Sequence, residues 1–225
     1  MTEPLILAVD TTHEFGSLAL LRGCELLDET LLHAPDGFGH VLYGRLGELL
    51  RRNSIAGGEV DCWASASGPG SFTGVRIGLA CVKGLGEALG RPVVAVSNLE
   101  AMASLGAASL RAAVLDARRG EVYGAVYDSG GGAVAPECVM AFPAWLDSLP
   151  DGELEFVAMD FTPFQPALAG TRFAETRVVT TPRSLAQAVG RIAARRFLAG
   201  EATDAAAVDA NYVRRSDAEL LWNDR

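Results

Sequence analysis

The sequence predicts an α/β protein built from two successive halves, and the pattern of its 225 residues indicates this in three ways. Short apolar runs alternate with segments in which apolar residues recur at helical spacing. Two of these runs end in an aspartate, Asp10 and Asp116. Each aspartate is followed by an extended segment that can pair with the preceding run as a hairpin. The pattern therefore restarts in mid-chain, and we place a soft domain boundary between residues 1–108 and 109–225.

The first half reads as β-β-β-α-β-α-β-α. Its first apolar run, ILAV, is continuous, as expected of a buried central strand, and Arg22-Gly23 separates the two arms of the hairpin that follows. The expected strands lie at residues 5–9, 16–21, 25–31, 62–66 and 93–96. The expected helices lie at residues 40–52, 73–89 and 98–105, the last with Asn98 as its N-cap.

The second half repeats the strand, the aspartate and the hairpin, and then becomes less regular. Expected strands lie at residues 112–115, 121–127 and 156–159, a turn at 129–132, and helices at 143–149 and 185–198. Ser184 and Gln187 form the pattern of a capping box before the last helix. Arg191, Arg195 and Arg196 lie on the polar side of that helix, where they form either a solvated face or a partner contact.

A glycine-rich stretch, SGPGSFTGVRI, joins the strand at 62–66 to the helix at 73–89. A strand, a glycine turn and a helix N-terminus can bind phosphate, but the spacing fits neither known template. Thr73 stands where a phosphate-binding loop needs its second glycine, and no lysine follows. The same Thr73 replaces the third glycine of a dinucleotide fingerprint. What remains is a tight turn into a helix, with Ser71 or Thr73 as the N-cap.

The helix after this turn is rich in glycine: Gly74, Gly78, Gly84 and Gly86 each cost about 0.8–1 kcal/mol of helix propensity relative to alanine. Gly74 and Gly78 share a face that another backbone could approach closely, either within this chain or from a partner. Arg76 lies in the first turn, where the helix dipole disfavours a cation, so we expect an acidic or anionic partner for it.

Composition restricts the classes of function. With 49% hydrophobic and 21% charged residues the chain can form a large core, and its net charge of −9 disfavours unaided binding of nucleic acid. An RNA role would need a more basic partner. The four cysteines form no CxxC pair and predict buried thiols in a reducing compartment. No targeting segment and no run of about 18 apolar residues is present, so we expect a cytoplasmic location and no membrane association.

The two aspartate turns match the plan of the actin, hexokinase and Hsp70 ATPases, in which such turns clamp ATP phosphates and a metal. The first turn reads DTTHEFGS, and Asp10, Thr11 and Thr12 would form its degenerate nucleotide site. The second reads DARRGEVY, where Arg118 and Arg119 place bulk and charge beside the aspartate. An autonomous ATPase or small-molecule kinase using Asp10 and Asp116 is one hypothesis, and aspartates that merely cap turns are the alternative.

Other catalytic arrangements have little support. The histidines are His13, His33 and His40, and none lies three or four residues from another, so no paired-histidine metal helix can form. We therefore expect no metal site and no metalloprotease. The sequence contains no GxSxG elbow, and we identify no catalytic residue.

Several of these motifs together resemble one family. ILAVDTT, SGPGSFTGVRIGLA, KGLGEALGRPVVAVSNLEAMA and LDARRGEVYGAVY are similar to the TsaB (YeaZ) family of tRNA threonylcarbamoyladenosine biosynthesis. The likeness is dense over residues 6–127 and weaker afterwards, where NYVRR at 211–215 is similar to a YLR-type segment. VAMDF at residues 157–161 replaces the glycine-rich strand end of many members.

The resemblance implies a duplicated actin-like (ASKHA, ribonuclease H-like) fold with a reduced second half. It also implies a non-catalytic subunit, without peptidase activity. With a TsaD-type catalytic subunit and a TsaE-type ATPase, this subunit supports threonylcarbamoyl transfer to the adenosine next to the anticodon in tRNAs reading ANN codons. The chain would have no cofactor of its own, although ATP or ADP could bind at the partner interface. It would form a homodimer when alone and meet tRNA only through the complex.

The same resemblance implies where the partner binds. In the family the helices of the N-terminal domain make this contact, which here are the helices at about residues 40–52 and 73–89. The interface residues carried over are His40, Gly70, Ser71, Phe72, Thr73, Gly74, Arg76 and Gly78.

Overall fold

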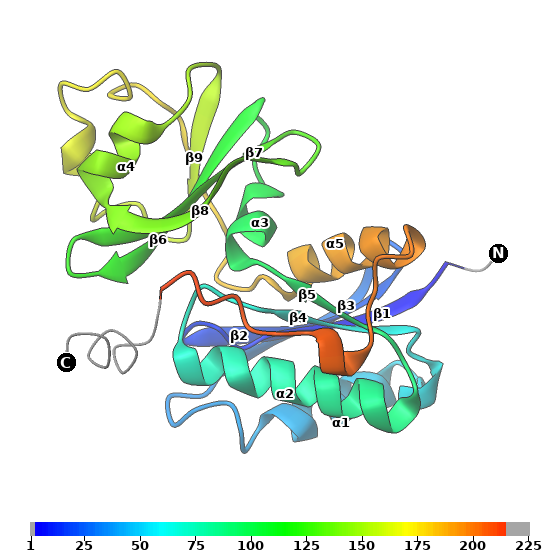
Figure 1. Cartoon of the computed structure of the whole chain (residues 1–225). Helices are drawn as coiled ribbons and strands as arrows, with labels where there is room; N and C mark the ends of the chain where they lie inside the picture. The colour runs from blue at the N-terminus through cyan, green and yellow to red at the C-terminus, as the bar shows by residue number, and fades with distance from the viewer. Residues whose placement is uncertain (1–2, 215–225) are drawn as a thin grey trace, which may run out of the picture. The chain divides into compact units, whose positions relative to one another are not determined.

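The computed structural model describes residues 3–214, which form two compact units (Figure 1). The first unit contains the chain up to residue 101 together with residues 183–211, and the second contains residues 102–182 and the chain from residue 212. The expected split into 1–108 and 109–225 differs from this division, because the chain returns to the first unit after residue 182. Arg215, the last residue of the NYVRR segment, lies outside the described residues.

The first unit is a mixed five-stranded sheet with helices on both faces. Its strands are β1 (Leu5–Asp10), β2 (Phe15–Arg22), β3 (Glu25–His33), β4 (Cys62–Ala66) and β5 (Val93–Val96), in the order β3-β2-β1-β4-β5. Strand β1 pairs antiparallel with β2 and parallel with β4. Every residue of β1 is buried, since this central strand is covered on both faces, as its continuous apolar run predicts.

The helices of this unit are α1 (Leu42–Arg52), α2 (Phe72–Leu89), α3 (Asn98–Ala103) and α5 (Ala186–Leu198). The last residues of α3 belong to the second unit. Two short 3₁₀ turns, η1 (Gly57–Glu59) and η3 (Ala205–Ala207), complete the first unit. Helices α1 and α2 cover one face of the sheet and α5 covers the other (Figure 1). The order β-β-β-α-β-α-β-α predicted for the first half is confirmed.

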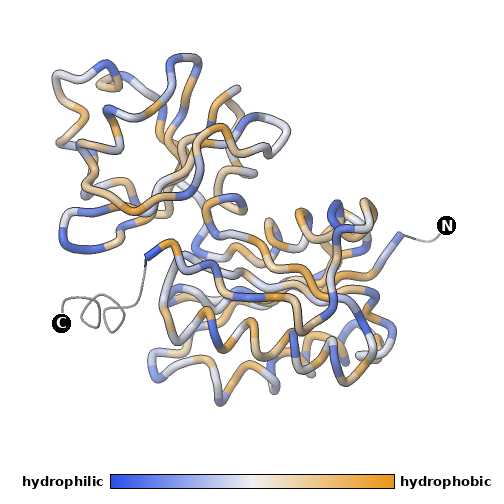
Figure 2. The backbone as a smooth tube through the Cα atoms, in the orientation of Figure 1, coloured by the Kyte–Doolittle hydropathy of each residue, from blue (hydrophilic) through white to orange (hydrophobic). Residues whose placement is uncertain are grey.

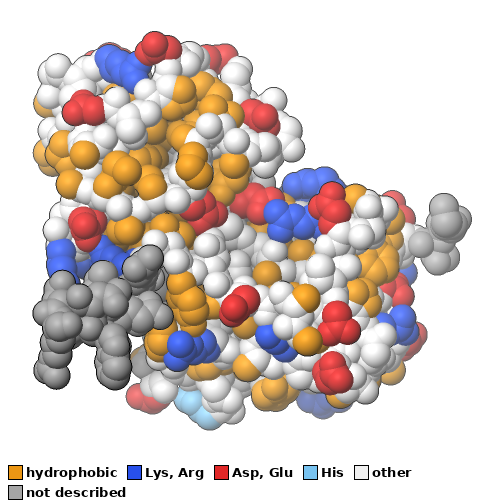
Figure 3. Space-filling model, viewed as in Figure 1, with side chains coloured by type: hydrophobic (Ala, Val, Ile, Leu, Met, Phe, Trp, Pro, Cys, Tyr) orange, Lys and Arg blue, Asp and Glu red, His pale blue; other side chains and the backbone are white. Residues whose placement is uncertain are grey.

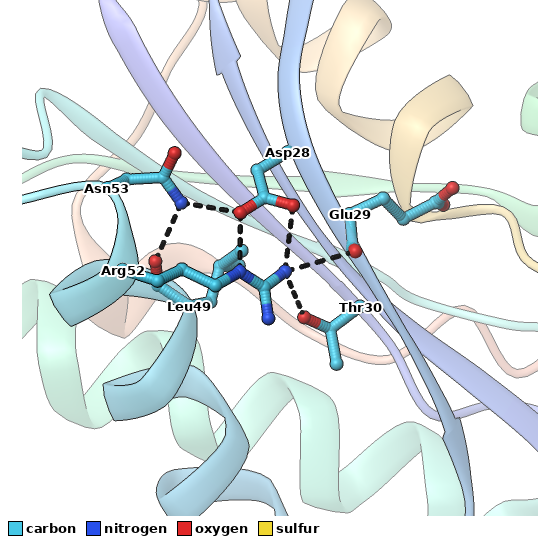
Figure 4. A network of polar contacts seen from close by, with 6 residues as sticks. All are labelled: Asp28, Glu29, Thr30, Leu49, Arg52 and Asn53. Atoms are coloured by element: carbon cyan, nitrogen blue, oxygen red, sulfur yellow. Dashed lines mark hydrogen bonds and ion pairs between the residues drawn. The ribbon is translucent and has the colours of Figure 1, made fainter.

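A polar network fastens the C-terminal end of α1 to strand β3 (Figure 4). Arg52 donates from Nε and Nη2 to the two carboxylate oxygens of Asp28, at 2.5 and 2.8 Å. Asn53 donates to the same carboxylate at 2.6 Å and to the carbonyl of Leu49 at 2.8 Å. The hydrogen bond from Arg52 is the main reason that the pKa of Asp28 falls to about 2.

The second unit repeats the topology of the first. Its strands are β6 (Leu110–Arg118), β7 (Glu121–Asp128), β8 (Ala133–Ala141), β9 (Leu154–Ala158) and β10 (Val178–Thr180), in the order β10-β9-β6-β7-β8. Strand β6 pairs antiparallel with β7 and parallel with β9, as β1 pairs with β2 and β4. The internal repeat and the α/β class predicted from the two aspartate-ended strands are thus confirmed.

The second unit is also the reduced copy. Helix α4 (Phe142–Ser148) follows its antiparallel strands as α1 follows those of the first unit. Between β9 and β10, where the first unit has the long helix α2, only the 3₁₀ turn η2 (Gln165–Leu168) is present. The hydrophobic core of the second unit contains a cluster of aromatic rings: Phe142, Trp145, Phe156, Phe161, Phe164 and Phe173. In Figure 2 the hydrophobic colouring runs along strands of the sheets, and the hydrophilic colouring gathers at turns.

Some local expectations were wrong. Strands β8 and β10 were not predicted, and α5 begins after Leu185, which makes no side-chain cap, so the capping box of Ser184 and Gln187 is not formed. The cysteines are not all buried: Cys62 and Cys81 are buried, but Cys24 is exposed.

Within residues 3–214 no helix has the length and apolar character needed to cross a membrane. Acidic and basic side chains are interspersed on the face of the first unit seen in Figure 3.

Candidate functional site

The glycine-rich loop between β4 and α2 is closed by hydrogen bonds from the chain itself. Gly68 N donates to Asn98 Oδ1 at 2.9 Å, and Gly68 O accepts from Asn98 N at 2.8 Å. Ser67 O accepts from Asn211 N at 2.8 Å, and Ser71 N donates to Thr12 O at 2.7 Å. The amides of Gly68 and Ser71 are therefore already satisfied by protein oxygens, and a phosphate would have to displace those acceptors.

Asp10, at the end of β1, has no exposed surface, and its carboxylate is used inside the first unit. One oxygen accepts hydrogen bonds from Thr12 N at 2.9 Å and Thr12 Oγ1 at 2.6 Å. The other accepts from Leu185 N at 3.3 Å, and Ser17 Oγ from the neighbouring strand accepts from Ala186 N at 3.1 Å. Asp10 and Ser17 thus supply the N-terminal cap that α5 lacks, and a carboxylate is stabilised at the positive end of a helix.

The other two residues of the expected nucleotide site are engaged in the same way. Thr11 Oγ1 donates to Gly74 O at 2.7 Å, which ties the turn after β1 to the first turn of α2. Thr12 Oγ1 accepts from Asn98 Nδ2 at 2.5 Å and lies 2.9 Å from His13 Nδ1. Burial lowers the pKa of His13, and the negative charge of Asp10 opposes this shift.

The second aspartate has a different environment. Asp116, near the end of β6, is exposed, and its Oδ1 accepts a hydrogen bond from Arg118 N at 2.7 Å. Arg118 and Arg119 follow with positive φ angles of 67° and 58°. Asp116 therefore caps a tight hairpin turn, which is the role that we considered as the alternative to nucleotide binding.

Two of the residues expected at a partner surface, Gly74 and Gly78, face the interior instead. A Cβ at Gly74 would overlap the carbonyl oxygen of Thr11, and one at Gly78 would lie 2.8 Å from both Ser65 Oγ and Thr11 Oγ1. Both glycines are buried. Their close approach is therefore to β4 and to the turn after β1 of the same chain. Gly84, by contrast, has open space around its Cβ position.

The remaining expected interface residues are exposed: His40, Gly70, Ser71, Phe72, Thr73 and Arg76. Ser71 is the N-cap of α2 and accepts from Gly74 N at 3.3 Å, as the sequence predicts. Phe72 is 47% exposed, and the guanidinium carbon of Arg76 lies 3.6 Å from the centroid of its ring. We call these exposed residues at the start of α2 (Ser71, Phe72, Thr73 and Arg76) the α2 ridge. A partner of Arg76 is thus an aromatic ring, through a cation–π contact.

A hollow of about 210 Å³ lies beside the α2 ridge. Its walls come from the turn after β1, the loop after β3 and the first two turns of α2, and include His13, Glu14, Phe38, Thr73 and Ile77. His13 and Glu14 were not expected at a site, since nothing in the sequence marks where the loop after β3 would fold. Within residues 3–214 no group of three or more His, Cys, Asp or Glu side chains could hold a metal ion.

Helix α1 lies next to α2 on the same face of the sheet. Its Tyr43 is 58% exposed, and the neighbouring Cys81 of α2 raises the pKa of the Tyr43 hydroxyl. Burial raises the pKa of Cys81 to about 11, so its thiol is inert at neutral pH. The α2 ridge and the exposed side of α1 are thus carried on one packed layer.

Comparisons with known proteins lead to proteins of one tRNA modification, tRNA threonylcarbamoyladenosine synthesis. A family model described as TsaD, tRNA N6-adenosine threonylcarbamoyltransferase, matches residues 41–166. The chain is 30% identical to the tRNA threonylcarbamoyladenosine biosynthesis protein TsaB of Bacillus subtilis, over 96% of this chain and 97% of that protein. It is 38% identical to the TsaB protein of Haemophilus influenzae, over 52% of this chain and 51% of that one.

Solved structures lead to the same relatives. A structure described as YeaZ from Pseudomonas aeruginosa superposes with a TM-score of 0.75 at 27% identity, covering 93% of this chain and 99% of that one. A second Pseudomonas aeruginosa structure, described as an uncharacterized protein with similarity to peptidase YEAZ, superposes with a TM-score of 0.76 at 26% identity, covering 94% and 100%. The likeness extends over both units of the chain.

Proposed function

The chain belongs to the TsaB family and takes part in tRNA threonylcarbamoyladenosine biosynthesis, and we propose that it does so as a non-catalytic partner subunit. In this proposal a TsaD-type subunit carries out threonylcarbamoyl transfer to the adenosine next to the anticodon of ANN-decoding tRNAs. A TsaE-type ATPase completes the assembly. In the absence of partners, the chain would form a homodimer through the surface that binds the TsaD-type subunit. It would act in the cytoplasm, where tRNA is modified.

The observation that carries the non-catalytic role is the state of Asp10. Its carboxylate is buried and accepts hydrogen bonds from Thr12 and from Leu185 at the start of α5. A nucleotide-bound metal at this carboxylate would have to uncap α5 and expose a buried turn. The same arrangement weighs against an autonomous ATPase or kinase that uses Asp10.

We assign the partner contact to the α2 ridge and the adjoining exposed side of α1. Phe72 supports this assignment, since its aromatic ring is about half exposed and contacts a guanidinium, and exposed aromatic and arginine side chains are enriched in protein interfaces. Tyr43 adds a second exposed aromatic side chain on the same layer. We propose that any ATP or ADP of the complex binds where this layer meets the partner, and not at Asp10.

The test is reconstitution with the TsaD-type and TsaE-type subunits from the same organism. We expect a stable complex with the TsaD-type subunit on gel filtration, and tRNA modification only when this chain is present. Phe72→Ala should weaken the complex at least about tenfold, as loss of a buried aromatic anchor does. Leu198→Ala, which truncates a side chain 66% exposed at the end of α5, is the control and should bind as the wild type does. A complex that fails to form, or a Phe72→Ala variant that binds normally, contradicts the proposal.

A further inference from the structure

The turn between β6 and β7, residues 116–120, has a backbone that suits its residues poorly. Arg118, Arg119 and Gly120 are consecutive residues with positive φ angles of 67°, 58° and 77°. Among residues 3–214 the other non-glycine residue with a positive φ is Ser54. Glycine or asparagine adopts this conformation readily, whereas long side chains do so at a cost. Strained backbone of this kind concentrates at functional sites.

Packing does not account for the two arginines. The side chain of Arg118 is 85% exposed, and Arg119 is also exposed. Arg118 Nη1 lies 3.4 Å from Asp116 Oδ2, in an exposed ion pair that contributes little. Figure 2 shows this end of the hairpin as a hydrophilic turn beyond the apolar strands. Neither arginine therefore occupies its strained position to fill the core.

The turn is braced by the rest of the second unit. Asp116 Oδ1 accepts from Arg118 N at 2.7 Å, and the carbonyl of Gly120 accepts from Phe142 N at 3.3 Å. Arg214 donates to the carbonyl of Ala117 at 3.0 Å and forms an ion pair with Glu121. These contacts fix the backbone from which both arginine side chains extend, and they bring a third guanidinium to the turn.

We infer that the turn at residues 116–120 binds phosphate groups of RNA, with Arg118 and Arg119 as the contacting residues. This inference rests on the proposed function, because the RNA is the tRNA held by the complex. A guanidinium presents a planar fork of N–H donors that matches phosphate oxygens, and two on one fixed turn can contact neighbouring phosphates. The aspartate turn of the first unit carries no arginine, so the basic turn is a feature of the second unit alone.

Charge explains why the contact would be made only in the complex. The chain has a net charge of −9, which repels a nucleic-acid backbone as a whole. A braced pair of arginines can add contacts once a partner subunit holds the tRNA. The alternative partner for these arginines is an acidic surface of the TsaD-type subunit, and binding measured with and without tRNA separates the two.

The test compares the assembled complexes of the wild type and the double variant Arg118→Gln, Arg119→Gln. Affinity for an ANN-decoding tRNA is measured by fluorescence anisotropy at salt concentrations from about 50 to about 300 mM, because affinity that depends on phosphate contacts falls steeply over this range. At the lowest salt concentration we expect the double variant to bind the tRNA about tenfold more weakly than the wild type does. The slope of log affinity against log salt should fall by about 1 for each arginine. The KM for tRNA should rise while kcat is unchanged, because phosphate contacts are lost equally from the ground state and the transition state.

Two further variants make the result decisive. Arg22→Gln removes one exposed arginine from the β2–β3 hairpin and should leave the salt slope unchanged. Arg119→Gly relieves the strained backbone, so it should raise the melting temperature while weakening tRNA binding. If the double variant has the wild-type salt slope, the inference is overturned and the proposed function stays intact. The same holds if the double variant no longer binds the TsaD-type subunit in the absence of tRNA, because the arginines then contact that subunit. A wild-type chain that forms no complex overturns both.

Discussion

Replacing Asp10 by asparagine should destabilise the protein far more than it affects any chemistry. The side chain keeps its shape, but an amide has one acceptor oxygen where the carboxylate has two. If that oxygen stays on Thr12, the amide nitrogen faces Leu185 N, and two donors then oppose each other where a 3.3 Å hydrogen bond was made. A charge-assisted hydrogen bond contributes about 1.5–3 kcal/mol, and the charge at the helix N-terminus about 0.3–1 kcal/mol.

The expected loss is therefore about 3 kcal/mol of the free energy of unfolding, with most of the effect at the start of α5. For a protein of this size such a loss lowers the melting temperature by about 6–12 °C. Thermal melts monitored by circular dichroism measure it, and hydrogen exchange should show faster exchange of the Leu185 and Ala186 amides. Mg-ATP should leave the melting temperature of the wild type unchanged, since a ligand that binds the native state raises it.

Asp116→Asn is the matched control, because it makes the same chemical change in the corresponding turn of the second unit. Its carboxylate is exposed, and an amide oxygen can keep the hydrogen bond from Arg118 N, so we expect a change below about 1 kcal/mol. The reasoning is refuted if Asp10→Asn melts like the wild type. It is refuted more strongly if the wild-type chain alone hydrolyses ATP and only Asp10→Asn abolishes that activity.

Two more predictions concern stability. Gly74→Ala should disrupt the junction of α2 with Thr11 and lower the free energy of unfolding by about 3 kcal/mol or more. Gly84→Ala, on the open side of the helix, should raise the free energy of unfolding by about 0.8–1 kcal/mol. Urea unfolding of both variants tests this, and equal effects would contradict the close packing of Gly74 against Thr11. The pKa of Asp28 is lowered to about 2, so its pairing with Arg52 stabilises fully above about pH 4 and is lost as the pH falls toward 2. Both side chains are partly exposed, so Arg52→Ala should cost only about 1 kcal/mol at pH 6 and almost nothing at pH 2, and a pH-independent difference would be contrary to this.

Much of the fold could be predicted because its signals are local. The continuous apolar run of β1 and the helical spacing after Ser71 identify the central strand and α2 within one or two residues. Strands β8 and β10 could not be predicted in this way. Strand β8 contains Pro136 and lies at the sheet edge with much of its surface exposed, and β10 is three residues long. Both are strands because they pair with β7 and β9, and that pairing is not encoded in either segment alone.

The site shows where local rules fail. Ser71 caps α2 by the local rule, with its acceptor three residues from the donor. The same rule predicted a capping box for α5, but the acceptors there are Asp10 and Ser17, which precede their donors by 175 and 169 residues. The glycine pattern of α2 was likewise ambiguous. Spacing places Gly74 and Gly78 on one face, but only the fold shows that β4 and the turn after β1 occupy it.

These hydrogen bonds together explain how the loop after β4 and the turn after β1 are held in place. The chain passes between its two units near residues 101, 182 and 211. Close to each passage a residue binds to the turn after β1 or to the loop after β4: Asn98 to Thr12 and Gly68, Leu185 to Asp10, and Asn211 to Ser67. The chain's own amides and side chains make these contacts, so the chain itself fixes the start of α2, where Phe72 and Arg76 are exposed.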